Sequence, residues 1–343
     1  MILLTPYLSH GSRSANGLAR IAGSAHPGRM AEQHSPADHQ FGGHSTDLKL
    51  SMVEGYLKGF TTALRQKFGT LVYIDAFAGT GVRTIKHKAR PADWLAEGSP
   101  ERIERRRGSA QIALDVNPRF DELVFIDAKP SHYRALCTLR DFHPDRRITA
   151  LHGDANEQIV HLLAERRWIN TRGVIFLDPY GMAVDWTTLE AIRRTSALDV
   201  WYLVSLEGLY RQAPRDRRKL DPSKRDAITK MVGASDWENR WYADKPQGGL
   251  FDLFDTYETA QHRGEPNMWR SAEIEDISAY FKERLTALFP KVLEPMVLRN
   301  NAGVRTFLLF FAIANSAPAA IGVATRIANH ILNAGRSSQN FSR

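Results

Sequence analysis

The feature that most constrains the fold is the repeated alternation of short apolar runs with helical patterns. An amphipathic helix starting near Thr46 leads into a first run, and three of the four later runs are followed by residues with helical periodicity. The runs are "LVYIDAF" (71–77), "ELVFIDA" (122–128), "ITALHGDA" (148–155), "GVIFLDP" (173–179) and "LDVWYLVS" (198–205). Such runs are typical of strands buried on both faces of a parallel sheet, with right-handed crossovers and helices on both sides. The sequence therefore predicts an α/β fold.

The alternation stops at both ends of this region. Residues 1–43 are rich in Ser, Gly, His and Ala, which predicts disorder, and Met30 could be the natural start. Residues 44–205 form the predicted core, and 206–290 are predicted to be an inserted, helical, basic subdomain. Residues 291–335 complete the sheet with "VLEPMVLRN" and "VRTFLLFFAIAN", an antiparallel hairpin joined by Asn300-Asn301-Ala302-Gly303, and a final helix.

Four predicted strands end in a carboxylate. In a doubly wound sheet, ligands bind beyond the carboxyl ends of the strands, where the strand order reverses. Any one of these acids could simply cap a helix or shape a turn. Together they predict a cofactor rich in hydrogen-bond donors. The four acids are Asp75, Asp127, Asp154 and Asp178.

The turn after the first strand reads Asp75-x-Phe77-x-Gly79-x-Gly81. Its glycines let the backbone pass close to a ligand, but a dinucleotide fingerprint would need a third glycine further on, which disfavours a nicotinamide oxidoreductase. An aspartate in the turn disfavours a pyrophosphate and suits a cofactor with a cationic amino-acid end. We therefore expect S-adenosylmethionine, with Asp127 accepting hydrogen bonds from its ribose. The long spacing from Gly79 to Asp127 predicts an insertion over 83–107.

The net charge of +8 is concentrated in two stretches, 83–107 and 211–225. Concentrated positive charge is what a nucleic-acid partner requires, although a solvated loop face explains it equally well. The single cysteine, Cys137, is predicted to pack in the core. Five of the 12 histidines lie in residues 1–44, so we expect no metal site. No apolar stretch is long enough to span a membrane, which predicts a cytoplasmic protein.

Several motifs, in this order, resemble those of the three-Cys-motif partner protein (TcmP) family, a branch of the class I methyltransferase-like superfamily. They are "FGGHSTDLKLSMVEGYL", "YIDAFAGTG", "GSAQIAL", "FIDA", "GDAN" and "FLDPYG" followed by "DWTTLEAI". The resemblance runs from about Phe41 to Asp199 and more loosely to the end. It departs at Gly108-Ser109-Ala110, where the family has Gly-Ser-Pro.

The resemblance implies a Rossmann-like, seven-stranded, mostly parallel methyltransferase sheet that binds S-adenosylmethionine. It also implies a partner, a radical-S-adenosylmethionine-like protein with three cysteines. It would place Asp75, Gly79 and Gly81 at the methionine end of the cofactor, Asp127 at the ribose, and Asp154 with Ala155 at the adenine.

The stretch Asp178-Pro179-Tyr180-Gly181 lies where methyltransferases acting on exocyclic amines carry Asp-Pro-Pro-Tyr. There a carboxylate accepts hydrogen bonds from the amine and an aromatic ring stacks on an extruded base. The alternative is that Pro179 and Gly181 only shape a turn and Tyr180 packs against the next helix. We predict a methyltransferase acting on nucleic acid through Asp178, Pro179 and Tyr180. The alternative function is a non-catalytic, cofactor-binding subunit of the three-cysteine protein.

Overall fold

The fold was analysed in a computed structural model, which describes residues 44–87, 102–244, 268–300 and 302–341. These residues belong to one compact unit. The predictions for 1–43, including the one on Met30, lie outside the described residues. No helix in the described part of the chain is long and apolar enough to cross a membrane.

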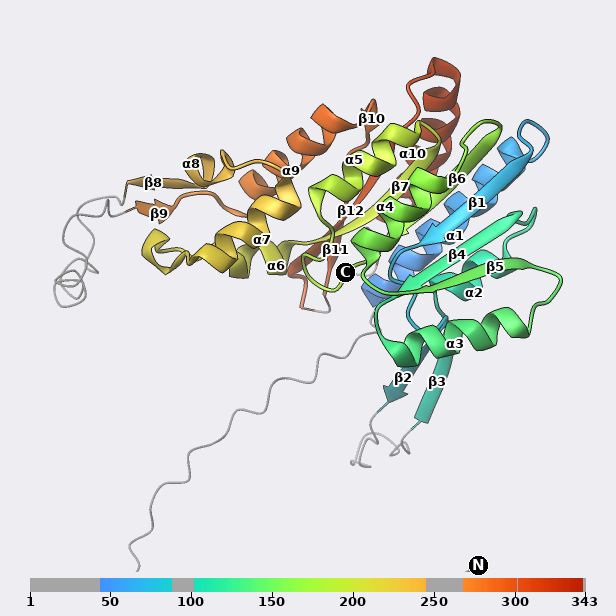
Figure 1. The fold of residues 1–343 in the computed structure, drawn as a ribbon. Helices are drawn as coiled ribbons and strands as arrows, with labels where there is room; N and C mark the ends of the chain where they lie inside the picture. The colour runs from blue at the N-terminus through green and yellow to red at the C-terminus, as the bar shows by residue number, and fades with distance from the viewer. Residues whose placement is uncertain (1–43, 88–101, 245–267, 301, 342–343) are drawn as a thin grey trace, which may run out of the picture. The chain divides into compact units, whose positions relative to one another are not determined.

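The central sheet has the order β10-β12-β7-β6-β1-β4-β5, and β11 also pairs with β12 (Figure 1). Five parallel strands come from the five predicted runs: β1 (Thr70–Asp75), β4 (Glu122–Asp127), β5 (Arg147–His152), β6 (Thr171–Leu177) and β7 (Leu198–Ser205). The predicted α/β fold, with a mostly parallel sheet, is confirmed. The order reverses between β1 and β6, because the chain continues from β1 to β4 on one side and returns to β6 on the other.

The predicted antiparallel hairpin completes the sheet. β12 (Arg305–Ile313) pairs antiparallel with β7, and two short strands, β10 (Lys291–Val292) and β11 (Met296–Arg299), pair with the other side of β12. The sheet thus has eight strands, because β10 and β11 both pair with the same side of β12. Gly303 adopts a φ of 78° in the turn, as the predicted reversal requires.

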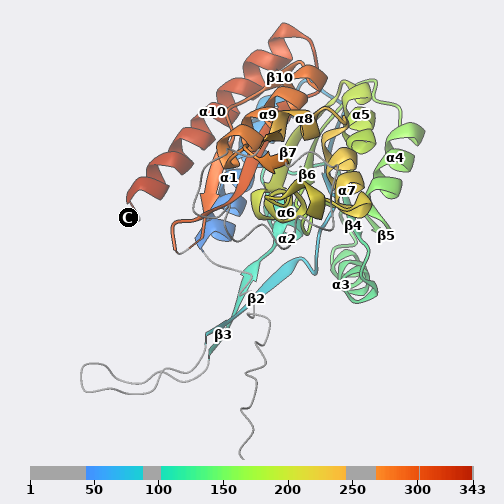
Figure 2. The same cartoon turned by 90° about the vertical axis from the view of Figure 1, so that its left-hand side faces the viewer.

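Helices cover both faces of the sheet because alternate strand residues face two apolar clusters (Figures 1 and 2). On one face lie α1 (His44–Leu64), α2 (Ser109–Asp115), α3 (Pro130–Asp141) and α10 (Pro318–Phe341). On the other lie α4 (Ala155–Glu165) and α5 (Trp186–Thr195). Cys137 on α3 is only half-buried, so its predicted core position is wrong; Leu136 is the buried residue of this helix.

Between β1 and β4 the chain forms a separate two-stranded hairpin, β2 (Val82–His87) and β3 (Arg102–Arg107). This hairpin occupies the predicted insertion, whose residues 88–101 lie outside the described part.

The described parts of 206–290 contain four α-helices and also a small sheet. Its elements are α6 (Leu206–Gln212), a 3₁₀ turn (Arg217–Lys219), α7 (Pro222–Val232), α8 (Trp237–Trp241), β8 (Tyr242–Asp244), β9 (Met268–Arg270) and α9 (Ile274–Leu288). Trp237, Trp241 and Phe281 are buried in the same apolar cluster as the neighbouring sheet face. The four-part division of the chain stays a prediction.

Candidate active site

A pocket of about 220 Å³ lies beyond the carboxyl ends of β1 and β6. This is where the strand order reverses, the position at which doubly wound sheets bind ligands. Five predicted site residues line it: Phe77, Gly79, Gly81, Asp178 and Tyr180. Further lining residues come from other elements: Thr46, Lys49 and Leu50 from α1, Arg83 from β2, Ser109 from α2 and His132 from α3.

The bend after β1 needs glycine for its backbone geometry. Gly79 and Gly81 have φ values of 62° and 77°, in the left-handed region that side chains disfavour. A Cβ at Gly79 would meet no atom within 4 Å, so the missing side chain leaves open space. At Gly79 the bend therefore leaves open space beside the backbone, and its contact with a ligand stays a prediction.

Asp75 ends β1 and is fully buried behind the pocket. Its Oδ1 accepts a hydrogen bond from the Phe77 amide and its Oδ2 accepts one from the Tyr73 hydroxyl, both at 3.3 Å. Burial raises the pKa of Asp75 to about 7, and the nearby Asp178 carboxylate adds to the rise, while a hydrogen bond from Ser109 opposes it. Among the described residues no cation pairs with Asp75, so a positively charged ligand group would stabilise its ionised form.

Asp178 follows β6 and pairs with a lysine that the sequence analysis missed. Lys49 donates to Asp178 Oδ2 at 2.5 Å, with only 9% of the lysine side chain exposed. The two residues are 129 positions apart. A signal was present, since Lys49 interrupts the apolar face of α1 between the buried Leu48 and Leu50.

Tyr180 lies at the rim of the pocket and is 62% exposed. Lys129 Nζ lies 5.0 Å from the centre of its ring. The stacking role of Tyr180 and its alternative, packing against the next helix, both stay predictions. Pro179 is buried.

Asp127 ends β4 at the same edge of the sheet but does not line the pocket. Its Oδ2 accepts from the Gly79 amide at 2.9 Å and lies 3.0 Å from His132 Nδ1, and its Oδ1 accepts from the Lys129 amide at 2.8 Å. Asp127 is thus linked to the pocket through Gly79 and His132.

Asp154 and Ala155 lie further along this edge, outside the pocket lining. The Asp154 carboxylate caps α4 by accepting from the amides of Asn156 and Glu157, at 2.9 and 3.2 Å. Ala155 is buried against the apolar cluster. Their roles at an adenine ring stay predictions.

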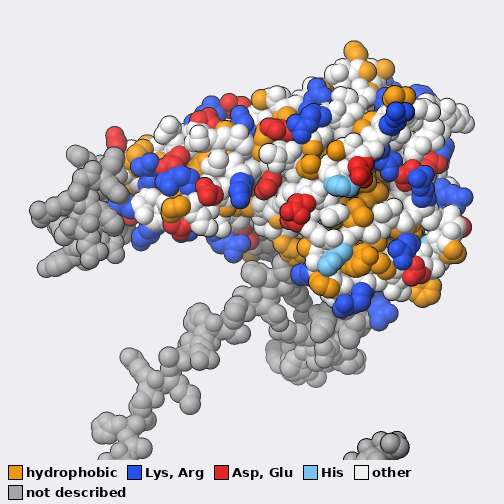
Figure 3. Space-filling view, in the orientation of Figure 1, with side chains coloured by type: hydrophobic (Ala, Val, Ile, Leu, Met, Phe, Trp, Pro, Cys, Tyr) orange, Lys and Arg blue, Asp and Glu red, His pale blue; other side chains and the backbone are white. Residues whose placement is uncertain are grey.

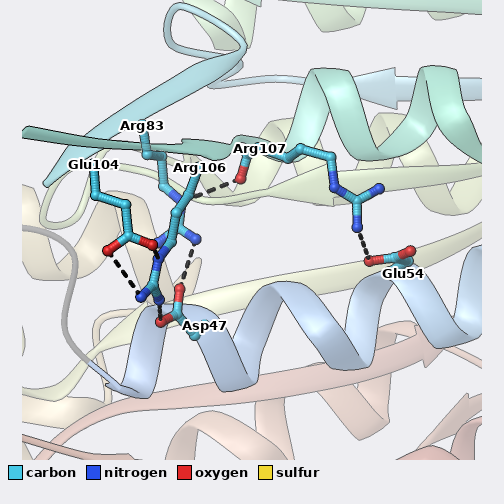
Figure 4. A network of polar contacts seen from close by, with 6 residues as sticks. All are labelled: Asp47, Glu54, Arg83, Glu104, Arg106 and Arg107. Atoms are coloured by element: carbon cyan, nitrogen blue, oxygen red, sulfur yellow. Dashed lines mark hydrogen bonds and ion pairs between the residues drawn. The ribbon is translucent and has the colours of Figure 1, made fainter.

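The cations of the β2–β3 hairpin are largely paired within the chain (Figure 4). Asp47 on α1 accepts from Arg83 at 2.6 Å and also pairs with Arg106, and Glu54 accepts from Arg107 at 3.0 Å. These contacts fix the base of the hairpin to α1. They also neutralise much of the charge on which the nucleic-acid prediction rested, while Arg105 remains exposed.

The second basic stretch, 211–225, is also partly neutralised. Arg217 and Arg225 share Glu238, Arg218 pairs with Asp216, and Lys224 pairs with Asp221. On the face shown in Figure 3, acidic and basic side chains are interspersed. Three exposed cations have no side-chain ion pair to a described residue: Arg211, Arg215 and Lys219.

A larger hollow of about 460 Å³ lies between α1 and α10, lined by Gly59, Ile327 and neighbouring residues. No predicted site residue lines it. We therefore place the candidate site in the smaller pocket, which has the Asp178 carboxylate, a glycine bend and an exposed aromatic ring.

Comparisons with known proteins find only distant similarity. No protein-family model and no curated protein matches the chain. Among solved structures, a Clostridium acetobutylicum S-adenosylmethionine-dependent methyltransferase is 10% identical with a TM-score of 0.32, over 76% of this chain and 91% of that one. The magnesium protoporphyrin IX methyltransferase of Synechocystis is 9% identical with a TM-score of 0.31, over 78% and 85%.

The protein LPL1258 of Legionella pneumophila is 14% identical with a TM-score of 0.36, over 59% of this chain and 77% of that one. TM-scores this low decide neither the family nor the activity of the chain. The TcmP resemblance stays a prediction.

Proposed function

We propose that this chain is an S-adenosylmethionine-dependent methyltransferase that acts on nucleic acid. The observation that carries the proposal is the pocket at the strand-order reversal, which combines a glycine bend, the buried Asp75, Asp178 and the exposed Tyr180. The expected cofactor has a cationic amino-acid end and a sulfonium. Both suit a pocket backed by a buried carboxylate that has no cationic partner among the described residues.

The chain's own residues would position the reacting groups. The bound cofactor would supply an activated methyl group, and transfer depends mainly on holding the acceptor in line with it. Asp178 Oδ1 accepts no hydrogen bond from a described residue, so it is free to accept one from an amine. The exposed Tyr180 ring offers a stacking surface for a flat base.

Two features support nucleic acid as the acceptor. α6 starts directly after β7, at the same edge of the sheet as the pocket, and the cations Arg211, Arg215 and Lys219 are on or just after it. Exposed cations that follow β7 in the chain would contact phosphates, which release counterions on binding. Lys129 next to Tyr180 adds a further positive charge at the rim.

A second candidate is the non-catalytic, cofactor-binding subunit of a three-cysteine protein. The Lys49–Asp178 ion pair favours it, because this contact neutralises the carboxylate that catalysis would use.

Transfer of labelled methyl groups from the cofactor to cellular RNA, DNA and protein distinguishes the two candidates. We expect label in nucleic acid, reduced about 100-fold or more in Asp178→Ala because the amine loses its acceptor. Asp145→Ala is the matched control, since this surface carboxylate pairs only with Arg119 and its side chain is 68% exposed. Cofactor binding without transfer to any fraction would favour the non-catalytic subunit, and label surviving in Asp178→Ala would exclude the proposed role of Asp178.

A further inference from the structure

The pocket has cations as well as a carboxylate in its wall. Asp178 supplies negative charge in the wall and Asp75 is buried behind it, while Lys49 and Arg83 supply positive charge from α1 and β2. A pocket with both signs is suited to a ligand with both signs, such as the ammonium and carboxylate of an amino acid.

Lys49 has unused hydrogen-bonding capacity. Its ammonium has three donors, and one of them bonds to Asp178. The side chain is 9% exposed, so water has little access to the remaining donors. A buried cation with one hydrogen-bond acceptor among the described residues is costly, and a second acceptor would lower that cost.

Arg83 has an unused donor as well. Its Nη2 donates to Asp47 at 2.6 Å and its Nε donates to the Arg107 carbonyl at 3.3 Å. Its Nη1 is shielded from solvent and has no hydrogen-bond partner in the described part of the chain. Buried donors are rarely left unpaired, and such an atom in a pocket residue indicates that an acceptor is missing.

We propose that Lys49 and Arg83 form the binding site for the carboxylate of the amino-acid end of S-adenosylmethionine. The inference rests on the proposed function. The ammonium of the same ligand would lie toward Asp75 and Asp178, where a positive charge is required. The Lys49–Asp178 contact holds the two oppositely charged parts of the subsite together before the ligand binds.

The experiment is a calorimetric titration of the full chain with S-adenosylmethionine and with its decarboxylated analogue, which keeps the ammonium, sulfonium and adenosine. We expect Arg83→Gln and Lys49→Gln each to weaken binding of S-adenosylmethionine about ten- to a hundredfold, the effect of a lost charge-assisted hydrogen bond. Binding of the decarboxylated analogue should change by less than about threefold in Arg83→Gln.

Arg106→Gln is the matched control, because Arg106 also pairs with Asp47 but does not line the pocket. It should leave both affinities unchanged. Thermal unfolding shows whether Arg83→Gln folds. If it does not, Arg83→Lys is used in its place. The assignment would be overturned if Arg83→Gln weakened the binding of both ligands equally, or weakened the binding of neither. If the unmodified chain binds neither ligand, the proposed function itself fails and the assignment fails with it.

Discussion

Two buried carboxylates, Asp75 and Asp199, have similar environments but lie at opposite ends of the parallel strands. Asp75 ends β1 beside the pocket, and Asp199 is near the start of β7. Burial raises the pKa of each to about 7. Asp199 accepts a hydrogen bond from the Tyr56 hydroxyl at 2.6 Å and lines neither pocket described above.

Replacing Asp199 should make stability less dependent on pH. The folded chain holds this proton up to about pH 7, whereas an unfolded aspartate releases it near pH 4. The stabilisation from the protonated form is therefore complete below about pH 4 and lost as the pH rises through 7. Denaturant unfolding should show Asp199→Asn gaining about 1–3 kcal/mol relative to the unmodified chain between pH 5 and pH 8.

The exposed Asp145→Asn is the control for this measurement, and its stability difference should stay constant over the same range. A constant difference for Asp199→Asn would contradict the raised pKa. The unmodified chain and both variants contain Asp75. Its titration therefore contributes equally to the three stabilities and cancels from their differences.

At the residue scale, local chemistry was predictable from the sequence and partners were not. Asp75, Gly79 and Gly81 lie within one turn, whose residue types indicate its geometry and its exposed backbone. Lys49 pairs with Asp178, 129 residues away, and only the fold brings them together. The sequence did not indicate that charge in the basic stretch 211–225 is paired, because Glu238, the partner of Arg217 and Arg225, lies beyond it in the chain.

At the element scale, the first turns of α1 connect the hairpin to the pocket. Asp47 holds Arg83 and Arg106 of the hairpin, and Lys49, two residues later, holds Asp178 (Figure 4 shows the Asp47 contacts). The position of the first turns of α1 thus affects Arg83 and Asp178, which line the pocket. The sequence predicted both the helix and the insertion, but their contact depends on ion pairs between distant segments.

Removing Asp47 should loosen the hairpin without unfolding the chain. Its side chain is 32% exposed, and exposed ion pairs contribute at most about 1 kcal/mol each. In Asp47→Asn we therefore expect trypsin to cleave faster after Arg105, Arg106 and Arg107, as resolved by mass spectrometry, with little change in overall unfolding.

Glu283→Gln is the control for the proteolysis, because it removes the exposed pair with Arg240 in another segment. It should leave cleavage at the hairpin unchanged. Equal cleavage rates in Asp47→Asn and the unmodified chain would show that the ion pairs do not fix the hairpin.

At the scale of the whole molecule, the parallel sheet brings the site together. β1, β4, β5 and β6 run in the same direction, so the predicted acids Asp75, Asp127, Asp154 and Asp178 lie along one edge. This arrangement was predictable because buried parallel strands have a strong sequence signal. The described part of 206–290 packs on one sheet face through large aromatic residues, which no local pattern specified.

The most direct test of the account is hydrogen exchange of the full chain with and without saturating S-adenosylmethionine. The account predicts slower amide exchange over residues 77–83 and 127–133, which form the bend, the Asp127 contacts and the start of α3. Exchange at the hollow between α1 and α10, in residues 323–330, should stay the same. Protection confined to other segments, or none at saturating ligand, would contradict the claim that this pocket binds the cofactor.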